Sequence, residues 1–300
     1  MLDTYRDACL PLLMKYLALL ALLLLFSSCG GGFGGTSVSD SPAVLNVSGW
    51  DPKERQRGGD RYSQHDLSNL KKNGALGLIA RSAKGPLLDD KFPDFLKSTD
   101  EQGMLMGAYH FVTLNQDPAA QADSFVNRVR SIANRRGISH RKILLVGDFD
   151  TQSTPDRLVK FIQRVEQRTG VTPMTYLENS DGLRARLRNA TPAQKSVIRR
   201  SPYWLALYGP GGTERTMRSS GPLTPDSLMK EYGIWNDWAM WQYGGVMWQN
   251  GRSTAKHYNT SSWRSPRYFG NMSHPMERNV FKGNNGDLAA FWNRHGWAWW

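Results

Sequence analysis

Cysteine is scarce in this sequence: Cys9 and Cys29 are the only two among 300 residues. Two cysteines cannot form a disulfide framework, and no Cys/His spacing in the chain would build a structural zinc site. The six histidines are scattered and show no metal-binding spacing such as His-Glu-x-x-His. We therefore expect neither a metal nor another cofactor.

The sequence also lacks an apolar run long enough to span a membrane. The run at 16–26 has 11 residues and follows Arg6 and Lys15, whereas a spanning helix needs about 20. A charged start, an apolar middle and small residues after it are the order of a secretory signal. We therefore predict that residues 1–28 are a signal peptide and that the protein is exported.

Cys29 follows Phe26-Ser27-Ser28 and precedes a glycine-rich run at 30–35. This segment resembles the lipobox of bacterial lipoproteins, in which the cysteine is lipidated and becomes the mature N-terminus; the usual Leu is Phe26 here. The resemblance implies lipidation of Cys29, a flexible tether over 29–43 and a membrane-anchored location in the cell envelope. The alternative is an ordinary signal peptide with an incidental cysteine.

Acidic residues are few relative to basic ones. There are 26 Asp and Glu against 38 Lys and Arg, a net charge of +12. Such a balance favours polyanionic partners, among them nucleic acid, anionic lipids and acidic cell-wall polymers. The sequence has no recognised nucleic-acid-binding motif, and the predicted export also argues against a nucleic-acid partner.

Apolar, strand-like segments alternate with helical patterns over residues 44–300. Near-continuous apolar strands indicate burial on both faces, as in parallel sheets. The predicted strands are 44–47, 75–80, 104–111, 143–149, 173–177, 203–208 and 238–243. Helices are expected over 118–136 and from 154–155 onward, ended by Gly137 and Gly170. This alternation predicts an α/β fold with a single (β/α)8-like barrel. An open doubly wound sheet is the alternative, but no Gly-rich phosphate loop follows an early strand.

Two aspartates stand at the end of one predicted strand. Residues i and i+2 of a strand point to the same side, so Asp148 and Asp150 are expected to project together, with Cα atoms about 6.5–7 Å apart. At the mouth of a barrel, such a pair separates the two pKa values and allows an acid and a base to coexist. The alternative is a pair of solvated acidic residues that open a loop.

Several segments, in order along the chain, resemble the family 25 glycoside hydrolases, the Chalaropsis-type lysozymes. Residues 44–50 (VLNVSGW) are similar to the family's Asp-Val-Ser-x-Trp, and 77–85 (GLIARSAKG) to its Lys-Ala-Thr-Glu-Gly segment. Residues 107–111 (GAYHF) match Gly-x-Tyr-His-Phe, 148–150 (DFD) match Asp-x-Glu, and 277–283 (ERNVFKG) match Asp-x-Asn-x-Phe-x-Gly. The resemblance implies a flattened barrel that cleaves the β-1,4 bond between N-acetylmuramic acid and N-acetylglucosamine in peptidoglycan.

The departures from the family fall on its catalytic positions. Asn46 replaces the first-strand Asp, Asp150 the general-acid Glu, and Glu277 the last-strand Asp, while Asp148 is unchanged. We expect Asp148, Asp150 and Glu277 to be catalytic. Because Glu277 is one methylene longer than the Asp it replaces, it is the candidate acid, with an aspartate stabilising the oxocarbenium-like transition state.

The resemblance also implies a set of substrate contacts. Basic side chains at the mouth are suited to the lactyl or peptide carboxylates of muramic acid. An amide can hydrogen-bond a sugar, and aromatic rings can stack on its C–H faces. The predicted substrate-binding residues are Asn46, Arg81, Lys84, Tyr109, Tyr208, Trp241 and Asn279.

Two further hypotheses stay open at this point. The first is a catalytically inactive barrel that binds cell-wall glycan or a partner protein. The second concerns a polar insert at 249–275, which bears Arg252, Lys256, Arg264 and Arg267 and no acidic residue. It is interpreted as a lid or wall-binding surface, with an exposed basic loop as the alternative.

Overall fold

The computed structural model describes residues 41–51, 62–138, 140–207, 225–244, 248–249, 252–253, 269 and 276–300. The predicted signal peptide, Cys29, Tyr208 and most of the 249–275 insert lie outside these residues. Among the described residues, no helix combines the length and the apolar character that crossing a membrane requires.

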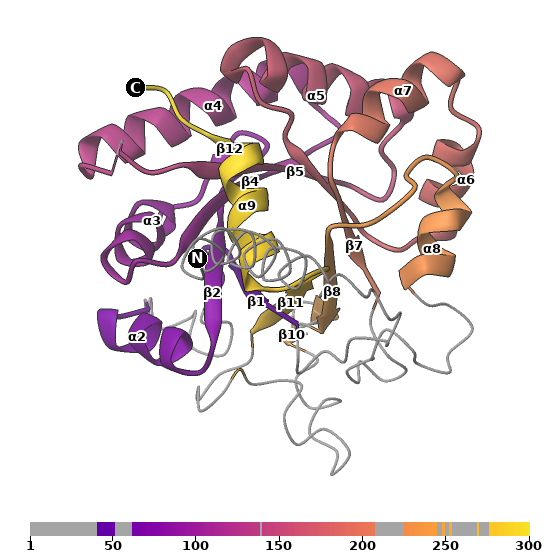
Figure 1. Ribbon diagram of the computed structural model, residues 1–300. Coiled ribbons are helices and arrows are strands. Elements are labelled where there is room, and N and C mark those ends of the chain that lie inside the picture. The colour runs from indigo at the N-terminus through magenta and orange to yellow at the C-terminus, as the bar shows by residue number, and fades with distance from the viewer. Residues whose placement is uncertain are drawn as a thin grey trace, which may run out of the picture. The chain divides into compact units, whose positions relative to one another are not determined.

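Eight strands of the described chain close into a barrel with helices around it (Figure 1). Their order is β1-β11-β8-β7-β6-β5-β4-β2, and β2 pairs back onto β1. The strands are β1 (Ala43–Val47), β2 (Ala75–Lys84), β4 (Leu105–Val112), β5 (Ile143–Phe149), β6 (Met174–Leu177), β7 (Tyr203–Ala206), β8 (Met240–Gly244) and β11 (Glu277–Phe281). The predicted barrel is confirmed, and the open sheet is excluded because β1 and β2 pair.

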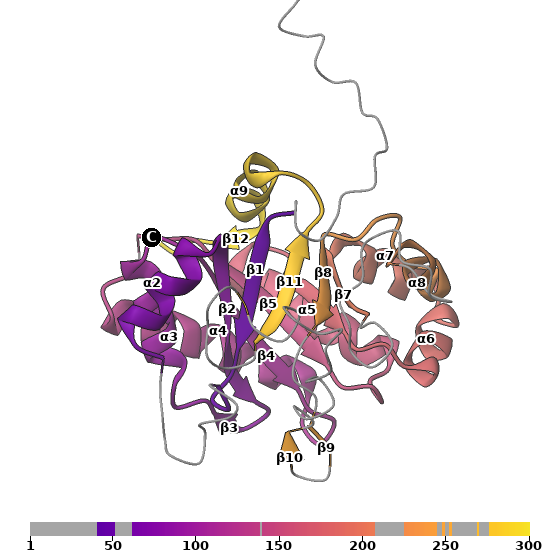
Figure 2. The same cartoon turned by 90° about the horizontal axis from the view of Figure 1, so that it is seen from below.

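One strand of the barrel runs against the others. The pairs from β1 through β8 are parallel, whereas β11 is antiparallel to both β1 and β8, between which it lies (Figure 2). Glu277 is the first residue of β11 and pairs with Asn46 near the end of β1. The start of β11 therefore reaches the face where the parallel strands end, which is the usual location of active sites in such barrels.

Apolar side chains fill the barrel and also cover its outside. Along β5, Leu144 and Val146 belong to the inner cluster, whereas Ile143 and Leu145 belong to the outer one. This alternation explains why the strand has no polar residue before Gly147, because both of its faces are buried. It also turns Asp148 toward the barrel interior, two residues after Val146.

The helices lie around the barrel, except that the last of them packs against one end of it. They are α2 (Gln64–Lys72), α3 (Phe92–Glu101), α4 (Pro118–Arg135), α5 (Pro155–Thr169), α6 (Asp181–Arg188), α7 (Pro192–Arg200), α8 (Pro225–Tyr232) and α9 (Asn285–His295). Asp117 caps α4 by accepting from the backbone N–H groups of Ala119 and Ala120. Gly170 ends α5 with a φ of 73°, a left-handed conformation that glycine adopts without strain. The sequence-predicted starts and ends of these two helices are confirmed.

The C-terminal segment closes the end of the barrel opposite Glu277. Leu288 and Trp292 of α9 join the inner apolar cluster, and Trp292 Nε1 donates to the Met106 carbonyl at the start of β4. The short strand β12 (Gly296–Trp297) then pairs with the start of β5. The remaining short strands are β3 (Leu87–Leu88), which pairs with β2, and the β9 (Trp248–Gln249) and β10 (Arg252–Ser253) pair.

Candidate active site

A cavity of about 190 Å³ opens at the face where the parallel strands end. Side chains from β1, β2, β4, β5, β6, β7, β8 and β11, or from the residues directly after them, contribute to its lining. The lining residues are Asn46, Ser48, Trp50, Arg81, Tyr109, Asp148, Tyr176, Glu178, Trp204, Gln242 and Glu277. The cavity therefore gathers three carboxylates, from the middle and the end of the chain, around one space.

Asp148 is the carboxylate that projects from β5. Its Oδ1 is buried and has no hydrogen-bond partner among the described residues. Loss of hydration raises the pKa of Asp148 well above its usual value, and the negative charges of Glu178 and Glu277 raise it further, while Arg81 opposes them. Asp148 thus holds a proton at a higher pH than an ordinary aspartate does.

Glu277 enters the cavity from β11 and is held by Asn46. Asn46 Nδ2 donates to Glu277 Oε2. Asn46 Oδ1 accepts from Gln242 Nε2 at 3.0 Å and from Asn279 Nδ2 at 2.9 Å. Because two amides donate to the Asn46 oxygen, its own N–H group is turned toward Glu277, and Glu277 acts as an acceptor.

A buried polar network fixes these groups from below. Asn279 Nδ2 also donates to the Val44 carbonyl at 2.9 Å, and Trp204 Nε1 donates to Asn279 Oδ1 at 2.9 Å. The Tyr176 hydroxyl donates to Gln242 Oε1 at 2.7 Å. Such interlocked hydrogen bonds position a reactive side chain rigidly.

This network corrects the predicted role of Asn279. Its side chain is fully buried and does not line the cavity, because its amide is engaged beneath Asn46. Asn279 therefore lies beneath Asn46, to which it donates a hydrogen bond, and is not exposed to the cavity. Asn46 itself lines the cavity as expected.

Asp150 does not line the cavity, contrary to the prediction that it projects with Asp148. The strand ends at Phe149, and Asp150 Oδ1 accepts from the Gln152 backbone N–H at 2.8 Å. Arg186 of α6 holds the same loop by donating to the carbonyls of Thr151 and Ser153. Asp150 thus fits the alternative interpretation of an acidic residue at the start of a loop. Its side chain accepts a hydrogen bond within a local turn of that loop.

Trp241 is a second correction. It is fully buried in the outer apolar cluster, where its Nε1 donates to the Leu207 carbonyl at 2.9 Å. Alternation along β8 turns Gln242 to the cavity and its neighbour Trp241 to the outside. Trp241 is therefore a core residue.

Tyr109 does line the cavity, and burial raises the pKa of its phenol well above 10, so the hydroxyl remains neutral.

The two predicted basic contacts differ in position. Arg81 lines the cavity, and its Nε lies 3.0 Å from Asp89 Oδ2, which also accepts from the Gly49 backbone N–H. Lys84 is exposed outside the lining, with its Nζ 4.8 Å from the centre of the Phe111 ring. Only Arg81 is thus placed to touch a ligand in the cavity.

Sequence reasoning missed Glu178, which follows directly after β6 and lines the cavity. Loss of hydration raises the pKa of Glu178, as do Asp150 and Glu277, while Lys84 opposes them. The available signal was a carboxylate immediately after a predicted parallel strand, the same position that drew attention to Asp150.

Trp50 is the second omission. It lines the cavity, and 56% of its surface is exposed. The sequence places this tryptophan in the 44–50 motif, three residues after the end of β1.

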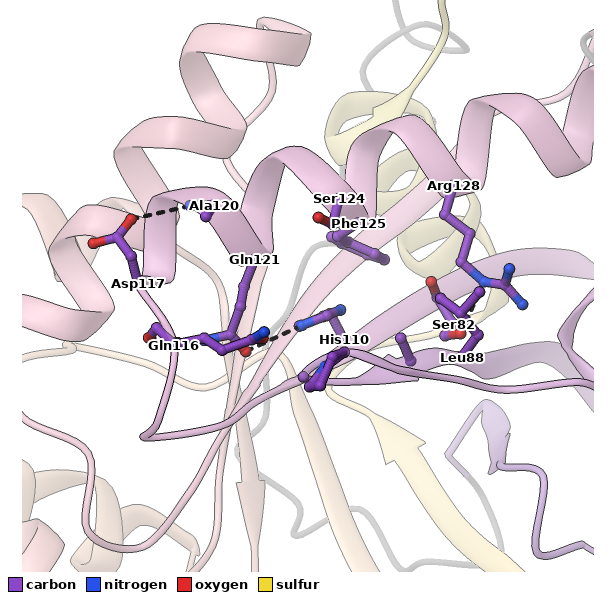
Figure 3. Close-up of a pocket in the computed structure, with 13 residues that line it drawn as sticks. Ser82, Leu88, His110, Gln116, Asp117, Ala120, Gln121, Ser124, Phe125 and Arg128 are labelled. Atoms are coloured by element: carbon purple, nitrogen blue, oxygen red, sulfur yellow. Dashed lines mark hydrogen bonds between the residues drawn. The ribbon is translucent and has the colours of Figure 1, made fainter.

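A larger cavity of about 470 Å³ lies outside the barrel, between β2, β4 and α4 (Figure 3). His110 lies in its wall and interacts with Gln121 through Nε2 at 3.3 Å. Burial lowers the pKa of His110 to about 4, so the ring is neutral. Asp117 is the carboxylate in this lining, and its Oδ1 caps α4. This cavity therefore lacks a pair of reactive carboxylates.

Elsewhere in the described part of the chain, no group of three or more His, Cys, Asp or Glu side chains is arranged to hold a metal ion. The chemistry of the barrel mouth is thus that of carboxylates, an arginine, a phenol and aromatic rings. This set is suited to acid/base catalysis on a hydroxylated ligand.

The family model of glycosyl hydrolases family 25 matches residues 60–251. The match covers more than half of the chain, and the protein belongs to this family. No match was found among curated protein sequences.

Solved structures of bacterial lysozymes and related enzymes share the fold. The spore cortex lytic enzyme SleM from Clostridium perfringens has a TM-score of 0.56 and 19% identity, over 82% of this chain and 69% of that one. The lysozyme from Streptomyces coelicolor has a TM-score of 0.53 and 20% identity, over 84% and 97%. The autolysin LytC from Streptococcus pneumoniae, in complex with a synthetic peptidoglycan ligand, has a TM-score of 0.50 and 11% identity, over 82% and 48%.

Proposed function

We propose that this protein is a peptidoglycan hydrolase that cleaves the β-1,4 bond between N-acetylmuramic acid and N-acetylglucosamine. The observation that carries the proposal is the convergence of Asp148 and Glu277 on one cavity at the mouth of the barrel. Membership of family 25 and the likeness to a lysozyme and a cortex-lytic enzyme support the substrate class.

Asp148 and Glu277 have different environments and therefore different roles. Asp148 brings a poorly hydrated carboxyl group to the lining of the cavity, and we assign it to the acetamido N–H of a bound sugar. Glu277 accepts a hydrogen bond from Asn46, which holds its carboxyl group in the lining of the cavity. We assign to Glu277 the stabilisation of positive charge in the transition state, and we withdraw the expectation that it is the acid.

Three further side chains are assigned to substrate binding. Trp50 brings an indole ring to the lining of the cavity, and the C–H face of a sugar can stack on such a ring. Arg81 is assigned to a lactyl or stem-peptide carboxylate, and the neutral Tyr109 phenol to a sugar oxygen. Asp148, Glu277 and these three residues make the cavity complementary to an N-acetylated, partly anionic glycan.

We further propose that lipidation of Cys29 anchors the enzyme in the cell envelope. The support is the sequence from Phe26 to the glycine run after the cysteine. Replacing Cys29 with Ser is expected to abolish incorporation of labelled fatty acid and to release the protein from the membrane fraction. Unchanged membrane association and labelling in the Cys29→Ser variant would refute the anchor.

The hydrolase is tested with the full-length protein and purified peptidoglycan. Wild type is expected to release fragments that carry N-acetylmuramic acid at their reducing ends, identified by reduction and mass spectrometry. Asp148→Asn and Glu277→Gln are each expected to abolish release, whereas Asp156→Asn, an exposed carboxylate on α5, leaves it unchanged. A wild-type protein that pellets with peptidoglycan but releases no fragment is instead the inactive, glycan-binding barrel.

A further inference from the structure

A glycosidase needs a proton donor, and the assignments above leave that position open. Glu277 accepts a hydrogen bond from Asn46, and Asp150 is turned into its own loop. Asp148 carries a short side chain with a buried oxygen at the end of β5. The remaining carboxylate in the lining is Glu178.

Glu178 lies next to the position that Asp150 occupies. In the parallel β5–β6 pair, Asp148 is opposite Tyr176 and Phe149 is opposite Leu177. Continued by one residue, this register brings Asp150 level with Glu178. Adjacent strands are about 4.8 Å apart, so a carboxylate on β6 can reach the space that a longer side chain at position 150 would occupy.

The backbone holds Glu178 in this place. The Tyr232 hydroxyl of α8 donates to the Glu178 carbonyl at 3.1 Å. Two residues later, Ser180 caps α6 by accepting from the Leu183 backbone N–H at 3.2 Å. The connection from β6 to α6 is therefore short and fixed at both ends, as a catalytic side chain requires.

The charges around Glu178 favour its protonated form. Poor hydration is the first cause of its raised pKa, and Asp150 and Glu277 add negative charge nearby. Asp150 thus acts on the site through its charge, although its side chain points elsewhere. A carboxyl group that keeps its proton to a higher pH than an ordinary glutamate does is suited to act as a general acid.

We propose that Glu178 is the proton donor for glycosidic cleavage, carried on β6 in place of the Glu that the family's Asp-x-Glu segment places after β5. The inference rests on the proposed hydrolase function. The Glu178 proton moves to the glycosidic oxygen as the C1–O bond breaks, and the bonding electrons leave with that oxygen. Water then adds to C1, and its proton returns to Glu178 directly or through Glu277, so one water is consumed.

The test compares two leaving groups in the same variant preparation. One substrate is a peptidoglycan oligosaccharide, whose sugar leaving group needs a proton. The other is a dinitrophenyl β-glycoside of an N-acetylmuramyl oligosaccharide, whose phenolate departs without one. Glu178→Gln is expected to lower kcat about 10²–10⁴-fold on the first and less than about 10-fold on the second, while Glu178→Asp retains part of the activity.

The matched control is Asp181→Asn. Asp181 is three residues after Glu178, its side chain is 95% exposed, and the change removes one negative charge. It is expected to leave kcat unchanged on both substrates. Because each variant is its own reference across the two leaving groups, a partial loss of folded protein cannot produce the expected pattern.

Three results would overturn the proposal. The leaving-group pattern could appear in Asp150→Asn or in Asp148→Asn while Glu178→Gln cleaves peptidoglycan normally, and the acid would then be on β5. Glu178→Gln could lower kcat equally on both substrates, which would indicate a structural role for Glu178. A wild-type enzyme that cleaves neither substrate would remove the hydrolase function itself, a failure distinct from the other two.

Discussion

Replacing Asn46 with Asp introduces a carboxylate near the end of β1, and it is expected to destabilise this protein in a pH-dependent way. Gln242 and Asn279 can still donate to one oxygen of the introduced carboxylate. The other oxygen then faces Glu277 Oε2, where Asn46 Nδ2 now donates. A hydrogen bond is thus replaced by a contact between two carboxylates.

The size of the effect follows from the two ways in which the protein can respond. Two charges roughly 3 Å apart at an effective dielectric constant of about 20 repel by about 5 kcal/mol. Protonating one ordinary carboxyl group at pH 7.5 costs about 4 kcal/mol, and the variant takes this cheaper course. At pH 4.5 the same proton costs only a few tenths of a kcal/mol.

The assay is urea unfolding of wild type and variant at pH 7.5 and pH 4.5. The free energy of unfolding is expected to fall by about 3–4 kcal/mol at pH 7.5 and by about 1 kcal/mol or less at pH 4.5. Asn46→Ala, which removes the amide without adding charge, is the control and should lose the same stability at both pH values. An equal loss for Asn46→Asp at the two pH values would refute the contact between Asn46 and Glu277.

Three further changes test other parts of the structure. Trp50→Ala is expected to raise KM for peptidoglycan oligosaccharides about 10-fold without changing the unfolding midpoint, because the ring lines the cavity yet is 56% exposed; an unchanged KM would exclude stacking. Trp204→Phe removes the donor to Asn279 Oδ1 and should cost about 1–2 kcal/mol in urea unfolding, and a neutral result would contradict the network. Burial lowers the pKa of His110 from 6.5 to about 4, so the unfolded chain binds the proton more tightly and stability falls by about 3 kcal/mol as pH drops from 6.5 to 4; His110→Gln should lose less over this range, and a ring titrating near 6.5 by NMR would refute the prediction.

Much of the barrel was predictable because its strands are apolar on both faces. The near-continuous apolar run of β5 indicated a parallel strand, and period-2 alternation from Leu144 and Val146 places Asp148 inside. The same alternation separates Gln242 from Trp241 in β8. Which of these two residues faces the cavity could not be assigned from the sequence, because both faces of the strand are buried and aromatic residues suit either face.

The site was harder to predict because its members depend on where each strand stops. Asp150 falls one residue past the end of β5, so the pairing rule for i and i+2 no longer applies, and its side chain closes a turn instead. Glu178 falls one residue past β6, and there the chain directs the carboxylate into the cavity. Two carboxylates at the same offset from a strand end thus point in different directions, because periodicity does not fix where a side chain points once the strand has ended.

Glu277 depends on a feature that no local pattern reveals, the antiparallel direction of β11. The resemblance of 277–283 to the family's closing segment was the signal that brought this residue to the site. From spacing alone, a residue at the start of a strand is expected at the opposite end of a parallel barrel. Family likeness and local periodicity thus supplied different parts of the site.

The substitutions at positions 46 and 277 are expected to be coupled. A longer Glu277 reaches the amide of Asn46, whereas an Asp at position 277 is about 1 Å shorter and loses that hydrogen bond, at a cost of about 1–2 kcal/mol. The same shortening moves the carboxylate away from an Asp at position 46, so the double variant Asn46→Asp/Glu277→Asp escapes part of the repulsion. In a double-mutant cycle at pH 7.5, the double variant should therefore lose at least about 1 kcal/mol less than the sum of the single variants. Additivity within about 0.5 kcal/mol would mean that the two residues do not interact.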